Sequence, residues 1–339
     1  MNKVYIILVN WNGWKDTIEC LESVLRLNYS SFRVIVCDNA STDGSLERIA
    51  DWASGKLEAG CSNPELLHLS FPPMPKPIPH LQVASGEQVD LGRSHERIIL
   101  VDTGANLGFA GGNNVGLRLA LAAGDLEYAW LLNNDTVVDP DALAALLERM
   151  EQRPDAGICG STLLYYNQPK LVQAMGGSIY NPWTARGGHI GLGKEWTGQA
   201  DHNSVEARIK YVVGASMFAR RRFLDEIGLM NESYFLYFEE VDWAIRARGR
   251  FSLAYAPQSL VYHKEGGSIG TSRIRANRSP MSEYYAARSC MLLTKKYLPL
   301  AAPGVATTLL VRSLIRLASG NRSGAKAVVS GLRDSFSEK

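Results

Sequence analysis

Short apolar runs alternate with longer segments of helical periodicity along the first part of the chain. Each apolar run ends in a polar or glycine-rich turn, and a segment with apolar residues at every third or fourth position follows. The runs that predict strands are residues 4–9, 33–37, 97–101 and 128–132. The segments that predict helices are 14–27, 43–52, 109–122 and one that starts at Asp139 and Pro140 and continues through Met150. This alternation predicts an α/β fold, in which helices flank a mostly parallel, Rossmann-like central sheet.

The alternation stops between residues 54 and 96. The proline-rich run 71–79 cannot sustain a helix or an interior strand, because proline lacks the backbone N–H that both need. We therefore interpret 54–96 as an inserted loop. Two later runs, 211–218 and 252–256, again have the pattern of strands.

Composition indicates an ordered globular chain without a strong overall charge. The 339 residues are 46% apolar and 21% charged, which suffices for one large core or for a core with a smaller appended unit. Because 36 Lys and Arg nearly balance 34 Asp and Glu, we expect no nucleic-acid partner. The odd number of cysteines and their lack of paired short spacings are typical of thiols in a reducing cytoplasm. They are Cys20, Cys37, Cys61, Cys159 and Cys290.

The N-terminal apolar run is too short for a secretory signal peptide, and no small-residue cleavage site follows it. We therefore expect a cytoplasmic protein. No stretch reaches the roughly 20 uninterrupted apolar residues needed to span a bilayer. The nearest candidate, 298–318, is interrupted by Pro303, Arg312 and Arg316.

Polar residues follow the first two predicted strands, where the carboxyl ends of parallel strands form the ligand-binding edge of a sheet. Asn10, Trp11 and Asn12 follow the first strand, and a polar segment starting at Asp38 follows the second. One hypothesis is a nucleotide pocket, in which Asp38 accepts a hydrogen bond from a base or ribose and Trp11 is an apolar wall. The alternative is that these residues only form turns and cap helices.

A glycine-rich segment follows the third predicted strand and begins a helix. Its glycines could let backbone amides approach a phosphate or a sugar at the helix N-terminus, or could serve a turn that needs positive φ. The residues concerned are Asn106, Gly108, Gly111, Gly112 and Asn113. The spacing does not match the dinucleotide-binding fingerprint, which follows the first strand, and this counts against a dehydrogenase.

The fourth predicted strand ends in Asn133, Asn134 and Asp135. A carboxylate at this position could hold Mg²⁺ or Mn²⁺ against a diphosphate, because these ions prefer oxygen ligands and keep substrate phosphates in their coordination shell. The alternative is an Asx turn that leads into the helix at Asp139.

Three carboxylates, Glu239, Glu240 and Asp242, interrupt an aromatic-rich stretch. Aromatic neighbours would desolvate a carboxylate and raise its pKa, which suits a general base. The same residues would also complement the dipole at the start of a helix that continues through Arg248. The two interpretations are compatible.

His263 ends a further strand, just before Gly266, Gly267 and Ser268. A single histidine is often structural. Its position at a strand end, after the carboxylate cluster, makes a metal ligand an equal alternative, since imidazole is acceptable to Mn²⁺.

Taken in order, these segments resemble the inverting family-two glycosyltransferases of the GT-A fold, particularly the branch of bacterial rhamnosyltransferases, over about residues 4–268. The resemblance implies that a nucleotide diphosphate sugar is the donor and that Asp38 contacts its nucleobase. It also implies that Asp135 and His263 hold the metal ion. The general base falls on Glu240, with the neighbouring acidic residues as alternatives.

The family also suggests a saccharide or a lipid-linked acceptor in cell-surface polysaccharide synthesis, and dTDP-rhamnose as the first donor to test. Two residues depart from the family pattern. Asn133 stands where the fuller metal motif has its first Asp, which leaves fewer anionic ligands, and Glu240 stands where Asp is commoner. The Gln-x-x-Arg-Trp signature of processive synthases is missing, which favours addition of a single sugar.

This interpretation divides the chain into a catalytic domain, residues 1–281, and a basic helical extension, 282–339. The catalytic domain would have a nucleotide-binding half, 1–136, and an acceptor half, 137–281. In the extension, one helix face could carry Leu309, Leu310, Leu314, Ile315 and Leu317, with Arg312 and Arg316 on the other face. Such a helix either packs on the catalytic domain or a second subunit, or lies in the interface of an anionic membrane.

Two other functions remain to be compared. A nucleotidyltransferase should have a glycine-rich loop with Arg and Lys directly after the first strand, where this chain has Asn10, Trp11 and Asn12. A noncatalytic protein that binds sugar nucleotides or polysaccharides would have no need for Glu239 and Glu240 in an apolar stretch.

Overall fold

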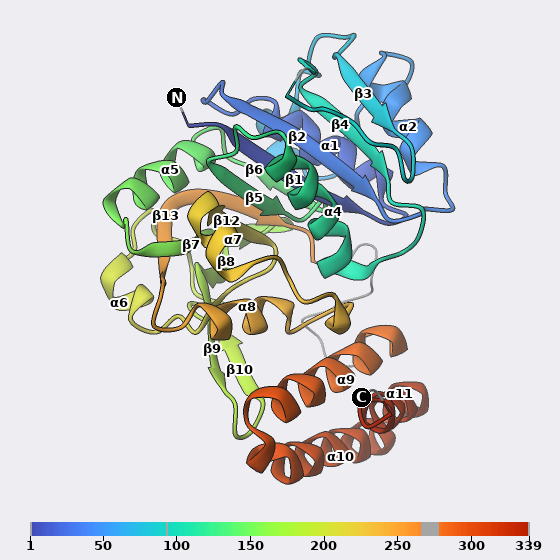
Figure 1. The fold of residues 1–339 in the computed structure, drawn as a ribbon, viewed down its shortest axis with the longest axis vertical. Coiled ribbons are helices and arrows are strands. Elements are labelled where there is room, and N and C mark those ends of the chain that lie inside the picture. The colour runs from blue at the N-terminus through green and yellow to red at the C-terminus, as the bar shows by residue number, and fades with distance from the viewer. Residues whose placement is uncertain (1, 93, 266–277, 338–339) are drawn as a thin grey trace.

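The computed structural model describes residues 2–92, 94–265 and 278–337. A large sheet with helices on both faces forms most of the molecule, and three helices from the end of the chain lie together at one end of it (Figure 1). Within the described residues the main sheet has ten strands. In spatial order they are β3 (His80–Val83), β4 (Ile98–Asp102), β2 (Phe32–Asp38), β1 (Val4–Asn10), β5 (Tyr128–Leu132), β12 (Ser216–Arg220), β7 (Ala156–Tyr165), β13 (Ser252–His263) and β6 (Thr136–Val138), with β8 (Gln168–Met175) paired to β7.

The sheet is mostly parallel, as the sequence predicted. The strands from β3 to β5 all run in the same direction, and β7 is parallel to β13. Three strands are antiparallel to their neighbours: β12, β6 and β8. The four strands predicted in the first part of the chain are all present, with ends that differ from the prediction by one residue at most.

Helices cover both faces of this sheet, so its strands are buried on both sides. On one face lie α1 (Trp14–Val24), α2 (Ser45–Ala53) and α5 (Ala142–Gln152), and on the other lie α4 (Gly108–Ala122), α7 (Arg221–Ile227) and α8 (Glu239–Ala247). Successive residues of β1 point to opposite faces, so Ile6 packs in the first core and Ile7 in the second. Burial of one such side chain stabilises the fold by roughly 1.5–3 kcal/mol.

The helix predicted to start at Asp139 and Pro140 begins later, at Ala142. The backbone N–H of Asp139 donates to the carbonyl of Leu260 at 3.1 Å, which holds this segment beside β13. The Asp139 carboxylate accepts from the N–H of Asp141 at 2.9 Å and therefore forms a turn before the helix, not its cap.

The inserted segment 54–96 contains more regular structure than the sequence predicted. It has a 3-10 helix, Pro64–Leu66, then α3 (Leu67–Ser70), and it supplies β3. β3 follows the proline-rich run directly and lies at the edge of the sheet, where a preceding proline costs no ladder hydrogen bond. The inserted-loop interpretation was therefore wrong for this strand, although the proline-rich run itself is irregular.

The run predicted as a single strand at 211–218 is two strands in two sheets. β11 (Tyr211–Val212) joins β9 (Gly177–Asn181) and β10 (Arg186–His189) in a small sheet, whereas β12 belongs to the main sheet. A turn containing Gly214 separates them. The strand predicted at 252–256 continues to His263, with an irregularity between Ala256 and Leu260. A short helix, α6 (His202–Glu206), lies between β10 and β11 in the sequence.

The end of the chain is helical, as predicted. It consists of α9 (Pro280–Tyr297), a 3-10 helix (Pro299–Ala301), α10 (Ala302–Ala318) and α11 (Arg322–Asp334). A separate apolar core joins these helices. Leu309 belongs to that core, and Arg316 is only 6% exposed, so neither lies on the helix face that the sequence predicted for it. The reason is the helical repeat, which puts Leu309 and Arg316 on the same side as Val305.

The exposed side of α10 is apolar. Leu310, Leu314, Ile315 and Leu317 are between 46% and 64% exposed. Among the described residues, one helix, Pro299–Ala318, has the length and apolar composition needed to cross a membrane, with a mean hydropathy of 1.3. Pro303, Arg312 and Arg316 interrupt this helix, so it is not the uninterrupted apolar stretch that the sequence analysis looked for, and 28% of it is buried.

Candidate active site

A cavity of about 1030 Å³ lies at the carboxyl ends of the parallel strands and extends to the C-terminal helices. Its wall is formed by the ends of β1, β5 and β13, the first turns of α4 and α8, strand β10, and one side of α10. Residues that are distant in the sequence therefore face the same space. This is the edge where a parallel sheet presents loops and side chains to a ligand.

Asp135 and His263 lie side by side on the cavity wall. The Nε2 atom of His263 is 3.1 Å from Oδ1 of Asp135 and 3.3 Å from the side-chain nitrogen of Asn133. The other ring nitrogen, Nδ1, is 2.9 Å from Oε1 of the buried Gln173. Since an amide oxygen only accepts hydrogen bonds, Nδ1 carries a proton and Nε2 is directed at the carboxylate.

This arrangement suits a divalent cation. A neutral Nε2 and a carboxylate oxygen are both acceptors, so their approach requires a shared proton or a shared cation. Burial acts to lower the pKa of His263, but the neighbouring Asp135 carboxylate outweighs it, and the pKa is raised overall. For Asp135, burial acts to raise the pKa, but the neighbouring His263 outweighs it, and the pKa is lowered overall. Within the described residues, no three or more His, Cys, Asp or Glu side chains lie close enough together to hold a metal by themselves. The remaining ligands would have to come from a diphosphate or water, as Mg²⁺ and Mn²⁺ sites commonly allow.

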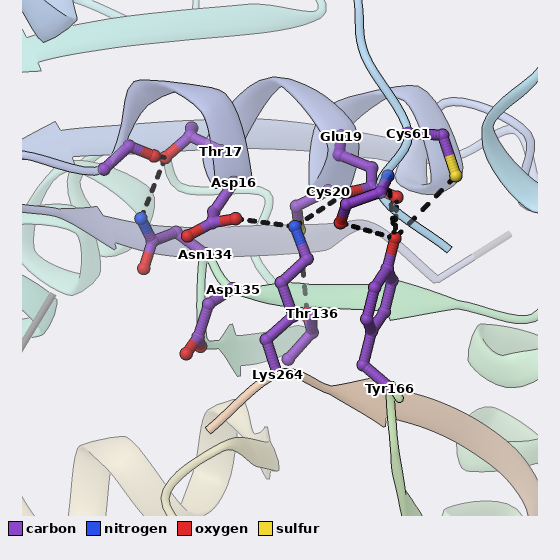
Figure 2. A network of polar contacts seen from close by, with 12 residues as sticks. Asp16, Thr17, Glu19, Cys20, Cys61, Asn134, Asp135, Thr136, Tyr166 and Lys264 are labelled. Atoms are coloured by element: carbon purple, nitrogen blue, oxygen red, sulfur yellow. Dashed lines mark hydrogen bonds and ion pairs between the residues drawn. The ribbon is translucent and has the colours of Figure 1, made fainter. Parts of the chain in front are cut away.

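A polar network behind Asp135 fixes the position of its strand end (Figure 2). The ammonium of Lys264 is 2.6 Å from carboxylate oxygens of both Asp16 and Glu19 on α1, while its backbone N–H donates to the carbonyl of Asp135 at 3.0 Å. Asn134 donates to Thr17 at 2.9 Å. Figure 2 shows the Asp135 carboxylate outside these contacts and directed away from Lys264. The network therefore aligns Asp135 without neutralising it by direct contact.

Glu239 and Glu240 start α8 and face the same cavity. One carboxylate oxygen of each, Oε2, is buried without a hydrogen-bond partner. Burial raises the pKa of Glu240 to about 7, and burial together with the charge of Glu240 raises the pKa of Glu239 well above its ordinary value. A carboxylate with a free buried oxygen and a pKa near neutrality suits proton transfer.

The loop before these carboxylates has an unusual backbone. Phe235, Tyr237 and Phe238 have φ angles of 61°, 67° and 72°, a region that large side chains rarely adopt. Such strain tends to occur where the surrounding structure needs a specific geometry, often at functional sites. Here it turns the chain directly into α8 and points its first two residues at the cavity.

Asp242 differs from its two neighbours because it does not line the cavity. Its carboxylate is fully buried and accepts hydrogen bonds from Tyr234, Arg246, Lys296 and Tyr297 at 2.7–3.1 Å. Burial would raise the pKa of Asp242, but these partners lower it overall. The residue therefore connects α8 to α9, and the structure gives it no access to a substrate.

The predicted donor-binding residues divide into two groups. Trp11, Asn106, Gly108 and Asn134 line the cavity. Asn10 and Asp38 are buried behind it, where Asn10 donates to Asp38 at 2.6 Å and the Asp38 carboxylate also accepts from Ser41. Asn12 bonds to the backbone N–H of Thr42, and the Asn113 side chain to the carbonyl of Phe109. The structure thus supports the turn-forming alternative for these residues, and contact between Asp38 and a nucleobase stays a prediction.

The glycines of α4 permit close packing. A Cβ at Gly111 would lie 2.6 Å from Cβ of Leu107, and one at Gly112 would lie 2.8 Å from a methyl group of Val9. At Gly108, where φ is +70°, a Cβ would clash with the carbonyl of Phe235. That carbonyl accepts from the N–H of Phe109 at 2.7 Å. Gly108 therefore lets the loop that carries Glu239 and Glu240 lie against α4.

Several cavity residues escaped the sequence analysis. Gln173 orients His263, and His189 faces the cavity with its Nδ1 2.7 Å from the Ser178 hydroxyl. Asn39 holds the start of α4 through the carbonyl of Gly108 at 2.9 Å. Gln173 stands between the apolar residues Val172 and Ala174 in the buried half of β8, and this was the one available signal. Gly266, Gly267 and Ser268, which follow His263, lie outside the described residues.

Known proteins were compared with this chain in sequence. A family model described as Glycosyl transferase family 2 matches residues 5–65 and 86–227, and the gap falls in the inserted segment. Low-salt glycan biosynthesis hexosyltransferase Agl10 of Haloferax volcanii is 29% identical over 158 residues, 46% of this chain and 48% of the relative. N-acetylglucosaminyl-diphospho-decaprenol L-rhamnosyltransferase of Mycobacterium tuberculosis is 28% identical over 198 residues, 52% of this chain and 62% of the relative. The chain thus aligns with less than two-thirds of either relative.

Solved structures show the same fold at low sequence identity. The S. aureus protein TarS 1-349 in complex with UDP-GlcNAc has a TM-score of 0.52 and 16% identity, covering 98% of this chain and 80% of that one. The mannosyltransferase PcManGT from Pyrobaculum calidifontis, in complex with GDP-Man and Mn²⁺, has a TM-score of 0.50 and 14% identity, covering 99% and 86%. These neighbours are GT-A glycosyltransferases, and the GT-A fold predicted from the sequence is confirmed.

Proposed function

The chain belongs to glycosyltransferase family 2, and from this premise we propose that it transfers a sugar from a nucleoside diphosphate donor to a saccharide or lipid-linked acceptor with inversion. The observation that carries the proposal is the shared cavity. The Asp135 and His263 pair lines the same cavity as Glu239 and Glu240, each of which has a carboxylate oxygen without a hydrogen-bond partner. The family match ends at residue 227, so the roles of Glu240 and His263 depend on this geometry.

In the proposed reaction, the acceptor hydroxyl attacks the anomeric carbon from the face opposite the diphosphate. Glu240, which lines the cavity, accepts the hydroxyl proton on its carboxylate as the bond forms. Glu239, the buried residue beside it, is the alternative base. Trp11 and the start of α4 border the space for the donor, and the rigid ends of β5 and β13 align Asp135 and His263 with its diphosphate.

The residues present fit a bound Mg²⁺ or Mn²⁺, which would neutralise charge on the departing diphosphate as a Lewis acid. Asp135 and His263 would hold it, and Gln173 would keep the imidazole in the ligating tautomer. The presence of Mn²⁺ in the complex of the mannosyltransferase neighbour supports this assignment.

The similarity to a rhamnosyltransferase and to a hexosyltransferase supports a hexose or deoxyhexose as the transferred sugar, with dTDP-rhamnose as the first donor to test. We propose a cytoplasmic enzyme that acts at the inner face of the membrane, where the exposed apolar side of α10 contacts lipid. Co-sedimentation with vesicles tests this contact, and no binding to anionic or neutral vesicles at low salt would contradict it.

The test of the function is a panel of UDP-, GDP- and dTDP-sugars incubated with purified protein and Mn²⁺. We expect at least one sugar nucleotide to raise the melting temperature and to be hydrolysed slowly, because a ligand that binds only the folded state stabilises it. Asp135→Ala should abolish both effects. Stabilisation without any turnover, with or without acceptors, would favour a noncatalytic binding protein.

A further inference from the structure

The small three-stranded sheet forms one side of the cavity. β9 is its central strand, and β10 and β11 pair with β9 on either side. Figure 1 shows β9 and β10 extending from the main sheet toward the C-terminal helices. Residues of all three strands line the cavity, among them Tyr180 of β9, His189 of β10 and Tyr211 of β11. This sheet is therefore in a position to contact whatever the cavity binds.

One row of polar side chains crosses the small sheet. His189 and Tyr211 each pair directly with Ser178, on opposite sides of it. Residues paired in this way project from the same face of a sheet. Ser178 is fully buried, and its hydroxyl lies 2.7 Å from Nδ1 of His189. His189 and Tyr211 therefore stand in line on the cavity wall, with Ser178 between them.

The His189 end of this row lies on the side of the proposed metal pair. The carbonyl of the next residue, Ile190, accepts from the N–H of Met175 at 2.8 Å, which holds β10 beside β8. Gln173, two residues earlier on β8, is the partner of His263. Burial, and then the nearby His263, lower the pKa of His189, so its ring is neutral near pH 7.

The Tyr211 end of the row lies on the side of the proposed base. Tyr211 packs against an apolar cluster that contains Val241, the residue after Glu240. Burial, and then the charge of Glu240, raise the pKa of the Tyr211 hydroxyl to about 12. The hydroxyl thus stays protonated at neutral pH and can donate a hydrogen bond. The row extends from the side of the metal pair to the side of the base.

His189 has hydrogen-bonding capacity left for a ligand. Its Nε2 has no hydrogen-bond partner among the described residues and is not one of their buried unpartnered atoms, so this nitrogen is accessible to solvent. The Ser178 hydroxyl can donate to Nδ1 or accept from it, so Nε2 either carries a proton or lacks one. A sugar hydroxyl matches both forms, because it can donate and accept.

The reaction geometry indicates which part of the substrates meets this row. In a single displacement the transferred sugar lies between the diphosphate and the attacking hydroxyl. In the proposed reaction Asp135 and His263 hold the diphosphate side, and Glu240 holds the hydroxyl. The sugar therefore extends in the same direction as the row. The acceptor approaches from the face opposite the diphosphate, away from the His189 end.

We propose that His189 and Tyr211 bind the hydroxyl groups of the transferred sugar and thereby select which donor sugar the enzyme accepts. Ser178 holds the His189 ring in place for this contact. The inference rests on the proposed glycosyltransferase function and names residues that determine its donor specificity.

The test compares ligands that differ only in the sugar, by titration calorimetry of the full chain with Mn²⁺. The sugar nucleotides are dTDP-rhamnose, UDP-GlcNAc and GDP-mannose, and their references are dTDP, UDP and GDP. His189→Ala and Tyr211→Phe should each weaken binding of the preferred sugar nucleotide by about 3- to 10-fold, the equivalent of one neutral hydrogen bond. The affinity for the matching nucleoside diphosphate should stay unchanged.

Two further variants serve as controls. His189→Gln keeps a side-chain amide near the position of Nε2 and should restore most of the affinity for the sugar nucleotide. His202→Ala removes a histidine of α6 that does not line this cavity, and it should bind both ligands as the unaltered protein does. Thermal melts of each variant establish that it is folded before its affinity is interpreted.

Three results would overturn the assignment to the donor sugar. One is normal binding of the sugar nucleotide by both His189→Ala and Tyr211→Phe. Another is equal weakening of the sugar nucleotide and the free nucleoside diphosphate, which would place the row at the nucleotide. The third is an unchanged donor affinity with a raised KM for the acceptor, which would assign the row to the acceptor.

Donor hydrolysis by the unaltered protein distinguishes this inference from the proposed function. Hydrolysis together with normal donor binding by both variants would reject only the inference. Sugar-selective binding that the variants lose, without hydrolysis or transfer of any donor, would reject the transferase and retain a sugar-binding site.

Discussion

The Nδ1 atom of His263 lies 2.9 Å from Oε1 of Gln173, a buried residue of β8. This contact fixes the ring so that Nε2 faces Asp135 at 3.1 Å. The pair is therefore prearranged for a cation by a hydrogen bond from the second ring nitrogen of His263 to Gln173. Partners of this kind commonly set the affinity of a metal site.

We expect Gln173→Ala to weaken activation by Mn²⁺ by about 10- to 100-fold, with activity restored at high Mn²⁺ concentration. The reason is that the imidazole would lose its orientation but not its ligating nitrogen. Titration of donor hydrolysis with Mn²⁺ measures the effect. Gln168→Ala, an exposed residue of the same strand, is the control and should leave the Mn²⁺ dependence unchanged. A loss of activity that Mn²⁺ does not restore would contradict the positioning role.

Glu240→Gln should retain donor binding while transfer falls by roughly 10²–10⁴, the usual contribution of a general base. The amide keeps the shape of the side chain but cannot accept the proton. Donor affinity and transfer rate are measured on the same preparation. Glu239→Gln is the matched comparison, and a larger loss there than at Glu240 would move the base to Glu239.

The raised pKa of Glu240 predicts opposite pH trends for activity and stability. The base must be ionised, so kcat/KM should rise with pH through about 7. Between its ordinary value of 4.5 and about 7, the folded state holds a proton that the unfolded state has lost, so this group lowers stability as pH rises. Glu240→Gln removes the titrating group, so the difference between this variant and the unaltered protein gives the contribution of Glu240 to both pH trends. An acid limb near pH 4.5 in the unaltered protein would contradict the assignment.

Asp242→Ala should destabilise the fold by about 2 kcal/mol or more, because it leaves several buried or partly buried donors without an acceptor. The exposed side chain of Lys296, its partner at 2.8 Å, keeps this value below that of a fully buried ion pair. Chemical denaturation measures the loss. Asp225→Ala removes the surface pair with Arg221 and should cost less than about 1 kcal/mol. If the two substitutions lower the free energy of unfolding equally, Asp242 does not have the structural role assigned to it.

Much of the sheet could be predicted from sequence because β1, β2, β4 and β5 are short, mostly apolar and bounded by polar turns. Element ends set by long-range contacts could not. The start of α5 depends on a hydrogen bond to Leu260, and β3 depends on its pairing with β4. The same limit applies to the division of 211–218 into two strands.

The site was predictable to the extent that its residues stand at strand and helix ends. Asp135, Glu239, Glu240 and His263 do, and the structure brings them to one cavity. Residues whose side chains point backward from such ends were indistinguishable in sequence. Asp38 and Asp242 also stand at the end of a strand and the start of a helix, yet their carboxylates accept hydrogen bonds from neighbouring side chains and backbone. Gln173 and the wall of α10 depend on tertiary packing that no local pattern shows.

A single displacement at a metal-bound donor inverts the anomeric carbon, so the anomer first released on donor hydrolysis reveals whether it occurs. The purified chain is incubated with Mn²⁺ and the donor that the panel identifies, and proton NMR follows the free sugar before mutarotation. We predict that the inverted anomer appears first and that EDTA or Asp135→Ala prevents its release. Initial release of the retained anomer would contradict inversion, and unchanged release in EDTA would contradict a metal-bound donor.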